Sequence, residues 1–136
     1  MGKPMIRIPE SIYRRMVEHA QKEKPLECCG LLGGKDQTVQ EIFEIQNVAR
    51  SPILFSMDTK EELMAFEEME SQSMEIIAIY HSHPHTIPFP SEADVRMAFS
   101  FNVPLVIISL KESDDSVVKA FRIRKEAIYL QDVEVI

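Results

Sequence analysis

The stretch IIAIYHSHPHTIPFPSEADVRMAF, residues 76–99, contains the residues around which the rest of the chain is organised. A short apolar run leads directly into His81 and His83, which are separated by a single residue. Side chains alternate along an extended backbone, so both imidazoles are expected on the same side of a strand. Ser91 and Asp94 follow a proline-rich loop, residues 84–90. They open a segment in which Val95, Ala98 and Phe99 have the i, i+3, i+4 spacing of a buried helix face.

These side chains predict a metal site. Two imidazoles at a strand end and a carboxylate in the first turn of a helix are ligand types that zinc prefers, and a site with three protein ligands leaves the fourth position open to water. Each part also has a simpler explanation, since Ser91-x-x-Asp94 is typical of a helix capping box and His-x-His is by itself a weak signal. The combination at this tight spacing favours a metal site.

A second segment, PLECCGLLGG at residues 25–34, contains Glu27 and three of the four glycines of the chain. A phosphate-binding loop is not expected here, because that motif needs glycine in place of Cys29 and serine or threonine in place of Asp36. The glycines fit close packing or a backbone left open for an extended peptide. A hydrolytic zinc site also needs a glutamate that moves protons without binding the metal, but the sequence alone cannot select it among 22 acidic residues.

Composition limits the possible functions. A chain of 136 residues with 45% apolar and 27% charged residues is expected to form one soluble domain, residues 1–136. The net charge of −7 argues against nucleic acid as a partner, and no apolar run is long enough for a membrane span or a signal peptide. The neighbouring Cys28 and Cys29 cannot form a disulfide framework, so a reducing cytoplasm is expected and both are interpreted as buried apolar residues. The roles of these cysteines and of His85, and the oligomeric state, stay open.

Hydrophobic periodicity predicts an α/β fold, a mixed sheet of about six or seven strands with about three helices packed on it. A helix over residues 57–73 is expected to turn Leu63, Phe66 and Met69 inward and a row of glutamates outward. A hairpin turn is expected at residues 113–116. The other expected helices cover residues 9–24 and the segment after Ser91, and the expected strands cover residues 6–8, 29–34, 39–48, 76–80, 105–110, 117–124 and 128–135.

The motif as a whole resembles the JAMM, or MPN+, metalloprotease family. The family pattern is an upstream glutamate, His-[Ser/Thr]-His, seven residues, Ser, two residues and Asp, and this chain meets it at Glu27, His81, His83, Ser91 and Asp94. The resemblance covers nearly the whole chain. It implies the JAB/MPN fold, a mixed sheet flanked by helices and related in outline to cytidine deaminases.

The resemblance also implies a role for each matching residue. His81, His83 and Asp94 would bind one zinc ion per chain, Glu27 would act as general base and then acid, and Ser91 would stabilise the oxyanion. The compact chain resembles short stand-alone prokaryotic members, which cut after the C-terminal Gly-Gly of ubiquitin-like or sulfur-carrier proteins. The expected function is therefore a zinc metallopeptidase or isopeptidase acting on such a protein.

The sequence bears on three alternative functions. A catalytically silent metal-binding scaffold on the same fold is disfavoured because such members generally lack parts of the motif, which is complete here. A nucleobase deaminase is disfavoured because its Pro-Cys-x-x-Cys signature is absent. A general peptidase of exposed chains is not excluded by any feature of the sequence.

Overall fold

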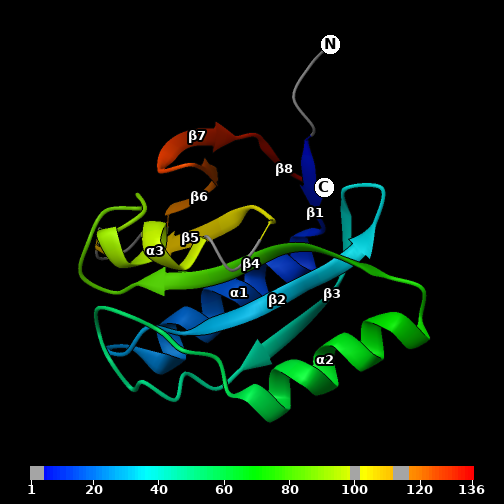
Figure 1. The fold of residues 1–136 in the computed structure, drawn as a ribbon, viewed down its shortest axis with the longest axis horizontal. Coiled ribbons are helices and arrows are strands. Elements are labelled where there is room, and N and C mark those ends of the chain that lie inside the picture. The colour runs from blue at the N-terminus through cyan, green and yellow to red at the C-terminus, as the bar shows by residue number, and fades with distance from the viewer. Residues whose placement is uncertain (1–4, 99–101, 112–116) are drawn as a thin grey trace.

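The fold is built on one mixed sheet of eight strands in the order β7-β6-β5-β4-β2-β3-β1-β8, shown in Figure 1. The computed structural model describes residues 5–98, 102–111 and 117–136. The predicted α/β class is confirmed, with eight strands in place of six or seven. The strands are β1 (Ile6–Ile8), β2 (Cys29–Lys35), β3 (Thr38–Ile45), β4 (Glu75–His83), β5 (Leu105–Ser109), β6 (Val117–Arg124), β7 (Ala127–Gln131) and β8 (Val133–Val135), and the helices are α1 (Glu10–Glu23), α2 (Thr59–Ser71) and α3 (Glu92–Met97).

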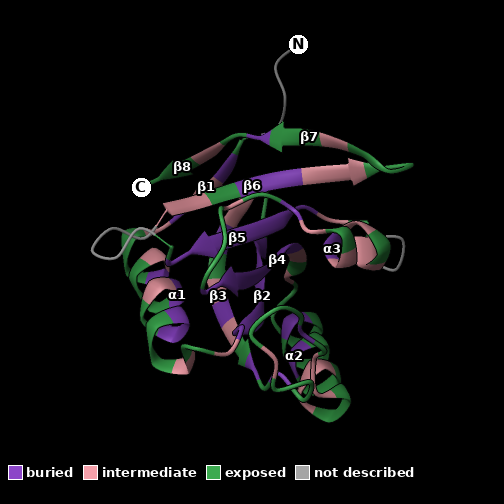
Figure 2. Ribbon diagram, turned by 90° about the vertical axis from the view of Figure 1, so that its left-hand side faces the viewer, coloured by how far each residue is buried: buried purple, intermediate pink, exposed green. Residues whose placement is uncertain are grey.

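The two faces of the sheet have separate hydrophobic cores. On one face α1 contributes Ile12, Met16 and Ala20 to a core that includes Tyr80 of β4. On the other face α2 contributes Ala65 and Met69, and α3 lies against the same side. The middle of the sheet is buried between these layers, and all five residues of β5 are buried, as expected for a central strand (Figure 2).

The orientation of α2 differs from the prediction. Leu63 and Phe66 were expected to face inward, but both are exposed, and only Met69 of the three expected residues is buried. The first turn of α2 is tied to the end of β3, because the Gln46 N–H donates to Glu61 Oε1 at 3.0 Å. This contact turns the i, i+4 row of Glu61, Ala65 and Met69 toward the sheet and leaves Leu63 and Phe66 outside.

The end of the chain also differs from the single strand predicted over residues 128–135. It forms β7 and β8, which pair with β6 and β1 at opposite edges of the sheet. Asp132 alone separates these strands, and its carbonyl accepts from the Ile6 N–H at 3.0 Å. The sheet therefore curls until its two edges meet at this residue.

The strand pairing determines where the chemistry can lie. β4 and β5 are parallel, so the chain must cross over between them, and this crossover contains the proline-rich loop and α3. This crossover brings the start of α3 close to the carboxyl end of β4. The carboxyl ends of the strands are a common place for ligand sites in open α/β sheets. The predicted hairpin turn at residues 113–116, and Phe99 of the predicted helix face, lie outside the described residues.

Candidate metal centre and active site

Strand β4 presents its two histidines on the face that carries α2 and α3. His81 and His83 alternate with Tyr80 and Ser82, so Tyr80 enters the opposite core, beneath α1. Both histidines are almost fully buried. The Phe55 ring lies beside His81 with a centroid separation of 4.6 Å, which fixes the imidazole from the side.

Helix α3 supplies the third member of the cluster through its N-terminal cap. Ser91 Oγ accepts the Asp94 N–H at 3.1 Å, and Asp94 Oδ2 accepts the Ser91 N–H at 2.9 Å, so the predicted capping box is present. The buried residue of this helix is Asp94, whereas Val95 and Ala98 are half-buried. The cap therefore orients a carboxylate toward the histidines as well as starting the helix.

The three side chains converge with distances that suit a small metal ion. Nε2 of His81 lies 3.1 Å from Asp94 Oδ1, Nε2 of His83 lies 3.1 Å from Asp94 Oδ2, and the two Nε2 atoms lie 3.2 Å apart. Ligand atoms 2.0–2.1 Å from a tetrahedral centre are separated by about 3.3 Å, close to these values. The structure thus brings together the three residues that were predicted as ligands, and they form a group that could hold a metal ion.

Hydrogen bonding identifies the protonation of His83. Its Nδ1 lies 2.9 Å from the Ile87 carbonyl oxygen, which can only accept, so Nδ1 carries the hydrogen. In the neutral ring Nε2 then points a lone pair at the Asp94 carboxylate. Two acceptors facing each other repel, so either a proton on Nε2, as in the imidazolium ring, or a metal ion must lie between them. This arrangement is the one seen when a backbone carbonyl orients a metal-binding histidine.

The electrostatics of the cluster keep Asp94 ionised. Burial alone would raise the pKa of Asp94, but hydrogen bonds from His81 and His83 outweigh it and hold the pKa well below its usual range. Burial lowers the pKa of His81, against the opposing effect of Asp94. For His83 burial also favours the neutral ring, but bonds to Asp94 and the Ile87 carbonyl raise the pKa overall.

Glu27 lies opposite His83 across the β2–β4 pair. The register pairs Cys29 with His81, and Ser82 continues it by exchanging hydrogen bonds with Cys28, whose N–H donates to Ser82 Oγ at 2.8 Å. The next step along these antiparallel chains puts Glu27 across from His83. Its side chain is 4% exposed, and Oε1 has no hydrogen-bond partner among the described residues.

The environment of Glu27 changes its acidity. Burial raises the pKa of this carboxyl from 4.5 to about 8, with His83 lowering it and Asp94 raising it by smaller amounts. Its backbone is held in place by Ser51 and by Asn47, whose Nδ2 donates to the Glu27 carbonyl at 3.0 Å. Asn47 is a positioning residue that the sequence does not reveal, since a single asparagine after a strand carries no recognisable signal.

The remaining candidates lie away from the cluster. His85 is exposed in the loop after β4. Cys28 and Cys29 are buried, and burial raises the pKa of the Cys28 thiol to about 12 and that of Cys29 still further above its usual value. Thiols held in the protonated form are poor ligands and nucleophiles, which agrees with their interpretation as buried apolar residues. His19 accepts or donates a hydrogen bond at 2.7 Å with the Tyr80 hydroxyl, beneath α1.

Comparison with known proteins agrees with this geometry. A family model described as prokaryotic homologs of the JAB domain matches residues 9–124. The CysO-cysteine peptidase of Mycobacterium tuberculosis H37Rv is 29% identical over 131 residues, which cover 95% of this chain and 90% of that protein. The desampylase of Pyrococcus furiosus is 34% identical over 99 residues, 73% of this chain and 71% of that protein.

A solved structure gives the same fold. The solution structure of a protein from Desulfitobacterium hafniense superposes with a TM-score of 0.87 at 32% sequence identity, and the match covers 97% of this chain and 92% of that chain. In the described part of the chain no helix is both long enough and apolar enough to cross a membrane.

Proposed function

Because this chain belongs to the family of prokaryotic JAB-domain homologues, we propose that it is a zinc metallopeptidase that hydrolyses the bond after the C-terminal Gly-Gly of a ubiquitin-like or sulfur-carrier protein. The observation that carries the proposal is the cluster of His81, His83 and Asp94 with Glu27 beside it, whose buried Oε1 has no hydrogen-bond partner among the described residues. The relatives are named as a peptidase of CysO-cysteine and as a desampylase, which supports a protein tail as substrate.

The three clustered residues would hold the metal. The lone pair of His83 Nε2, the Nε2 of buried His81 and one Asp94 oxygen are the donors, and borderline-soft nitrogen with one carboxylate suits zinc. Zinc bound there would polarise the scissile carbonyl and make water more acidic. Asp94, kept ionised by the two histidines, offsets one of the two positive charges of the ion.

Glu27 would move the proton. Its Oε1 takes a proton from the attacking water and then donates that proton to the leaving nitrogen, so amide and water end as a carboxylic acid and an amine, which at neutral pH become a carboxylate and an ammonium group. A general base works best when its pKa is close to the working pH, and burial shifts Glu27 in that direction. A nearby dication would bring this pKa down again from about 8, toward neutrality.

Ser91 would stabilise the oxyanion. Its Oγ accepts from the Asp94 N–H, which leaves the hydroxyl hydrogen available for a ligand. Losing one such donor costs about 3–4 kcal/mol of barrier in other hydrolases. Ser91→Ala is therefore expected to keep the metal and lose rate, together with about 1 kcal/mol of stability from the weakened helix cap.

The experiment for the proposed function compares three substrates by mass spectrometry. CysO, the carrier named for the Mycobacterium relative, serves as the probe, extended by one residue beyond a terminal Gly-Gly. The second substrate is the isolated tail, and the third is the carrier with Ala-Ala in place of Gly-Gly. The intact Gly-Gly carrier should be cut fastest, because its folded body adds binding energy that orients the tail.

Equal rates on all three substrates would instead assign the chain to the general peptidases. No cutting by a protein that contains stoichiometric zinc would favour the silent scaffold. A cytoplasmic location is part of the proposal, since two buried free thiols suit a reducing compartment.

A further inference from the structure

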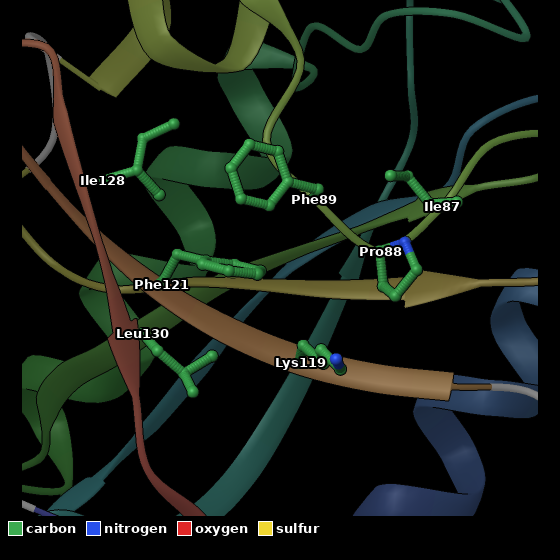
Figure 3. A pocket seen from close by; sticks show the side chains of 7 residues that line it. All are labelled: Ile87, Pro88, Phe89, Lys119, Phe121, Ile128 and Leu130. Carbon is green, nitrogen blue, oxygen red and sulfur yellow. The ribbon is translucent and has the colours of Figure 1, made fainter.

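A pocket of about 600 Å³ lies between the proline-rich loop and the last hairpin of the sheet. Figure 3 shows that the loop forms one wall, with Phe89 above the ring of Phe121, and that the hairpin forms the other. We call this the β6–β7 pocket, and its lining residues are Ile87, Pro88, Phe89, Lys119, Phe121, Ile128 and Leu130.

The pocket is apolar and open to solvent. Ile87, Phe89 and Leu130 are 56%, 48% and 56% exposed, although each is a large apolar side chain. Phe89 stands edge-on to Phe121, with ring centroids 5.5 Å apart, so the floor of the pocket is already formed. Exposed apolar side chains gathered around a preformed hollow are typical of a binding site.

The β6–β7 pocket lies on the same face of the sheet as the metal cluster. The strand register aligns His81 with Ile107, and Ile107 with Lys119, in one row across β4, β5 and β6. Residues directly opposite one another on neighbouring strands point to the same face. Two strand spacings separate His81 from Lys119, which is roughly 10 Å, or about three residues of an extended peptide.

The wall of the pocket is joined to a metal-ligand candidate. The Ile87 carbonyl accepts the hydrogen of His83 Nδ1 at 2.9 Å, so one residue both lines the pocket and orients the histidine. The same loop is anchored to β5, because Ser109 Oγ donates to the Thr86 carbonyl. A peptide that extends from the metal cluster along this face would therefore contact a loop that is fixed by hydrogen bonds to His83 and Ser109.

The single charge in the lining is positive. Lys119 is exposed, and among residues 5–98, 102–111 and 117–136 no carboxylate forms an ion pair with it. Apolar walls with one unpaired ammonium group fit an apolar segment that ends in a carboxylate. The glycines before the cut bond have no side chains to fill the pocket, and the carrier has no terminal carboxylate until that bond is broken.

We propose that the β6–β7 pocket binds the leaving group, a C-terminal extension of two or three residues with apolar side chains whose free carboxylate pairs with Lys119. The inference rests on the proposed function, because it identifies where the residues that follow the hydrolysed bond are bound. It makes the protein selective for short extensions that end in a carboxylate, over amines of protein lysine side chains.

The test uses CysO extended beyond Gly-Gly by Ala-Leu-Leu, prepared by ligation both as the free acid and as the C-terminal amide. The wild-type protein should cut the acid with a kcat/KM about threefold to tenfold higher than the amide, the scale of one charge-assisted contact. Lys119→Met should remove this preference by slowing the acid alone, and Lys119→Arg should retain it. Lys60→Met changes an exposed lysine of α2 and is the matched control, so it should behave as wild type.

A second pair of substrates tests the apolar walls. An Ala-Ser-Ser extension should be cut more slowly than Ala-Leu-Leu by the wild-type protein. The difference should shrink in Leu130→Ser, which changes an exposed side chain and leaves the buried Phe121 floor intact. KM and kcat are measured separately in both comparisons, and the weaker binding is expected to appear as a higher KM.

A binding measurement separates this inference from the proposed function. The tripeptide Ala-Leu-Leu, added to chelated protein, should shift amide NMR signals of β6 and β7 and leave those of α1 unchanged. If no substrate is cut but these shifts appear, the proposed function fails and the pocket assignment stands. Equal cutting of acid and amide by the wild type, or a Lys119→Met effect on every substrate alike, would overturn the leaving-group assignment.

Discussion

The two faces of the sheet bury polar groups in contrasting ways. Beneath α1, His19 and Tyr80 are both buried and satisfy each other through one hydrogen bond of 2.7 Å. On the opposite face His81 Nδ1 and Glu27 Oε1 are buried with no hydrogen-bond partner among the described residues. Tyr80 and His81 are neighbours in the sequence, yet one belongs to a closed core and the other to the proposed active site.

The two faces differ in whether their buried polar atoms have hydrogen-bond partners within the described part of the chain. Burying an unsatisfied polar atom costs stability, so a fold retains such atoms where a ligand or a reaction uses them. Both faces carry a hydrophobic core, but among the described residues the unsatisfied buried side-chain atoms lie on the α2–α3 face, at the proposed active site. Five predictions test that division.

The largest effect is expected from removing a ligand on the reactive face. His83→Ala should lose its zinc and reduce cleavage to background, because two ligands do not hold the ion in place. Elemental analysis of purified protein measures the metal directly. The matched change on the other face, His19→Gln, should keep one zinc per chain, and equal zinc in all three proteins would contradict the assigned centre.

The second effect concerns the proton carrier. Glu27→Gln keeps the shape of the side chain and removes its ability to accept a proton, so turnover should fall by about a hundredfold or more while zinc remains bound. Single-turnover kinetics with the extended carrier provide the rate. A variant with near wild-type turnover would show that another group is the base.

The third effect is on the stability of the metal-free protein. The pKa of Glu27 is about 8 in the folded chain and near 4.5 when unfolded, so folding favours the protonated carboxyl. Its contribution is complete below pH 4.5 and is lost as the pH rises toward 8. Glu27→Gln avoids this loss, so chelated Glu27→Gln should exceed chelated wild type in unfolding free energy by up to a few kcal/mol at pH 9.

Urea denaturation of both chelated proteins from pH 5 to pH 9 measures this difference. His81, His83 and Asp94 are common to both, so to first order their titration cancels. A stability difference that stays constant over the range would contradict the desolvation of Glu27.

The fourth effect compares two glycines of β2 that face different cores. A Cβ on Gly30 would collide with the Tyr80 ring and the Phe43 carbonyl, so Gly30→Ala should lose about 3 kcal/mol of unfolding free energy. A Cβ on Gly33 would lie 3.2 Å from Cγ and Sδ of Met69, a flexible side chain that can move, so Gly33→Ala should cost less. Denaturant unfolding ranks the two variants, and the reverse order would contradict the packing described for Tyr80.

The smallest effect is expected from the closed pair beneath α1. Tyr80→Phe removes the hydroxyl that bonds His19, at a cost of about 1 kcal/mol. Zinc content and turnover should match wild type, because Tyr80 points away from the cluster. A loss of activity beyond the loss of folded protein would show that the two faces are coupled.

The sequence by itself determined the parts of this protein that depend on local spacing. Alternation along a strand puts His81 and His83 on one side, and the capping pattern Ser91-x-x-Asp94 fixes a carboxylate at a helix start. The α/β class follows equally from periodicity, because each helix and strand shows its own repeat. The three residues predicted as ligands therefore lie together in the structure, in a group that could hold a metal ion.

Tertiary structure decided everything that depends on which segments lie opposite one another. Residues alone could not single out Glu27 among 22 acidic residues, whereas the fold buries its carboxyl where it interacts with His83 and Asp94. The exposed Leu63 and Phe66 follow from a contact between Glu61 and Gln46, and the β6–β7 pocket forms between a loop and a hairpin about 30 residues apart. Local periodicity determines which side chains a helix or strand carries on each face. Long-range pairing determines which other segments those side chains contact.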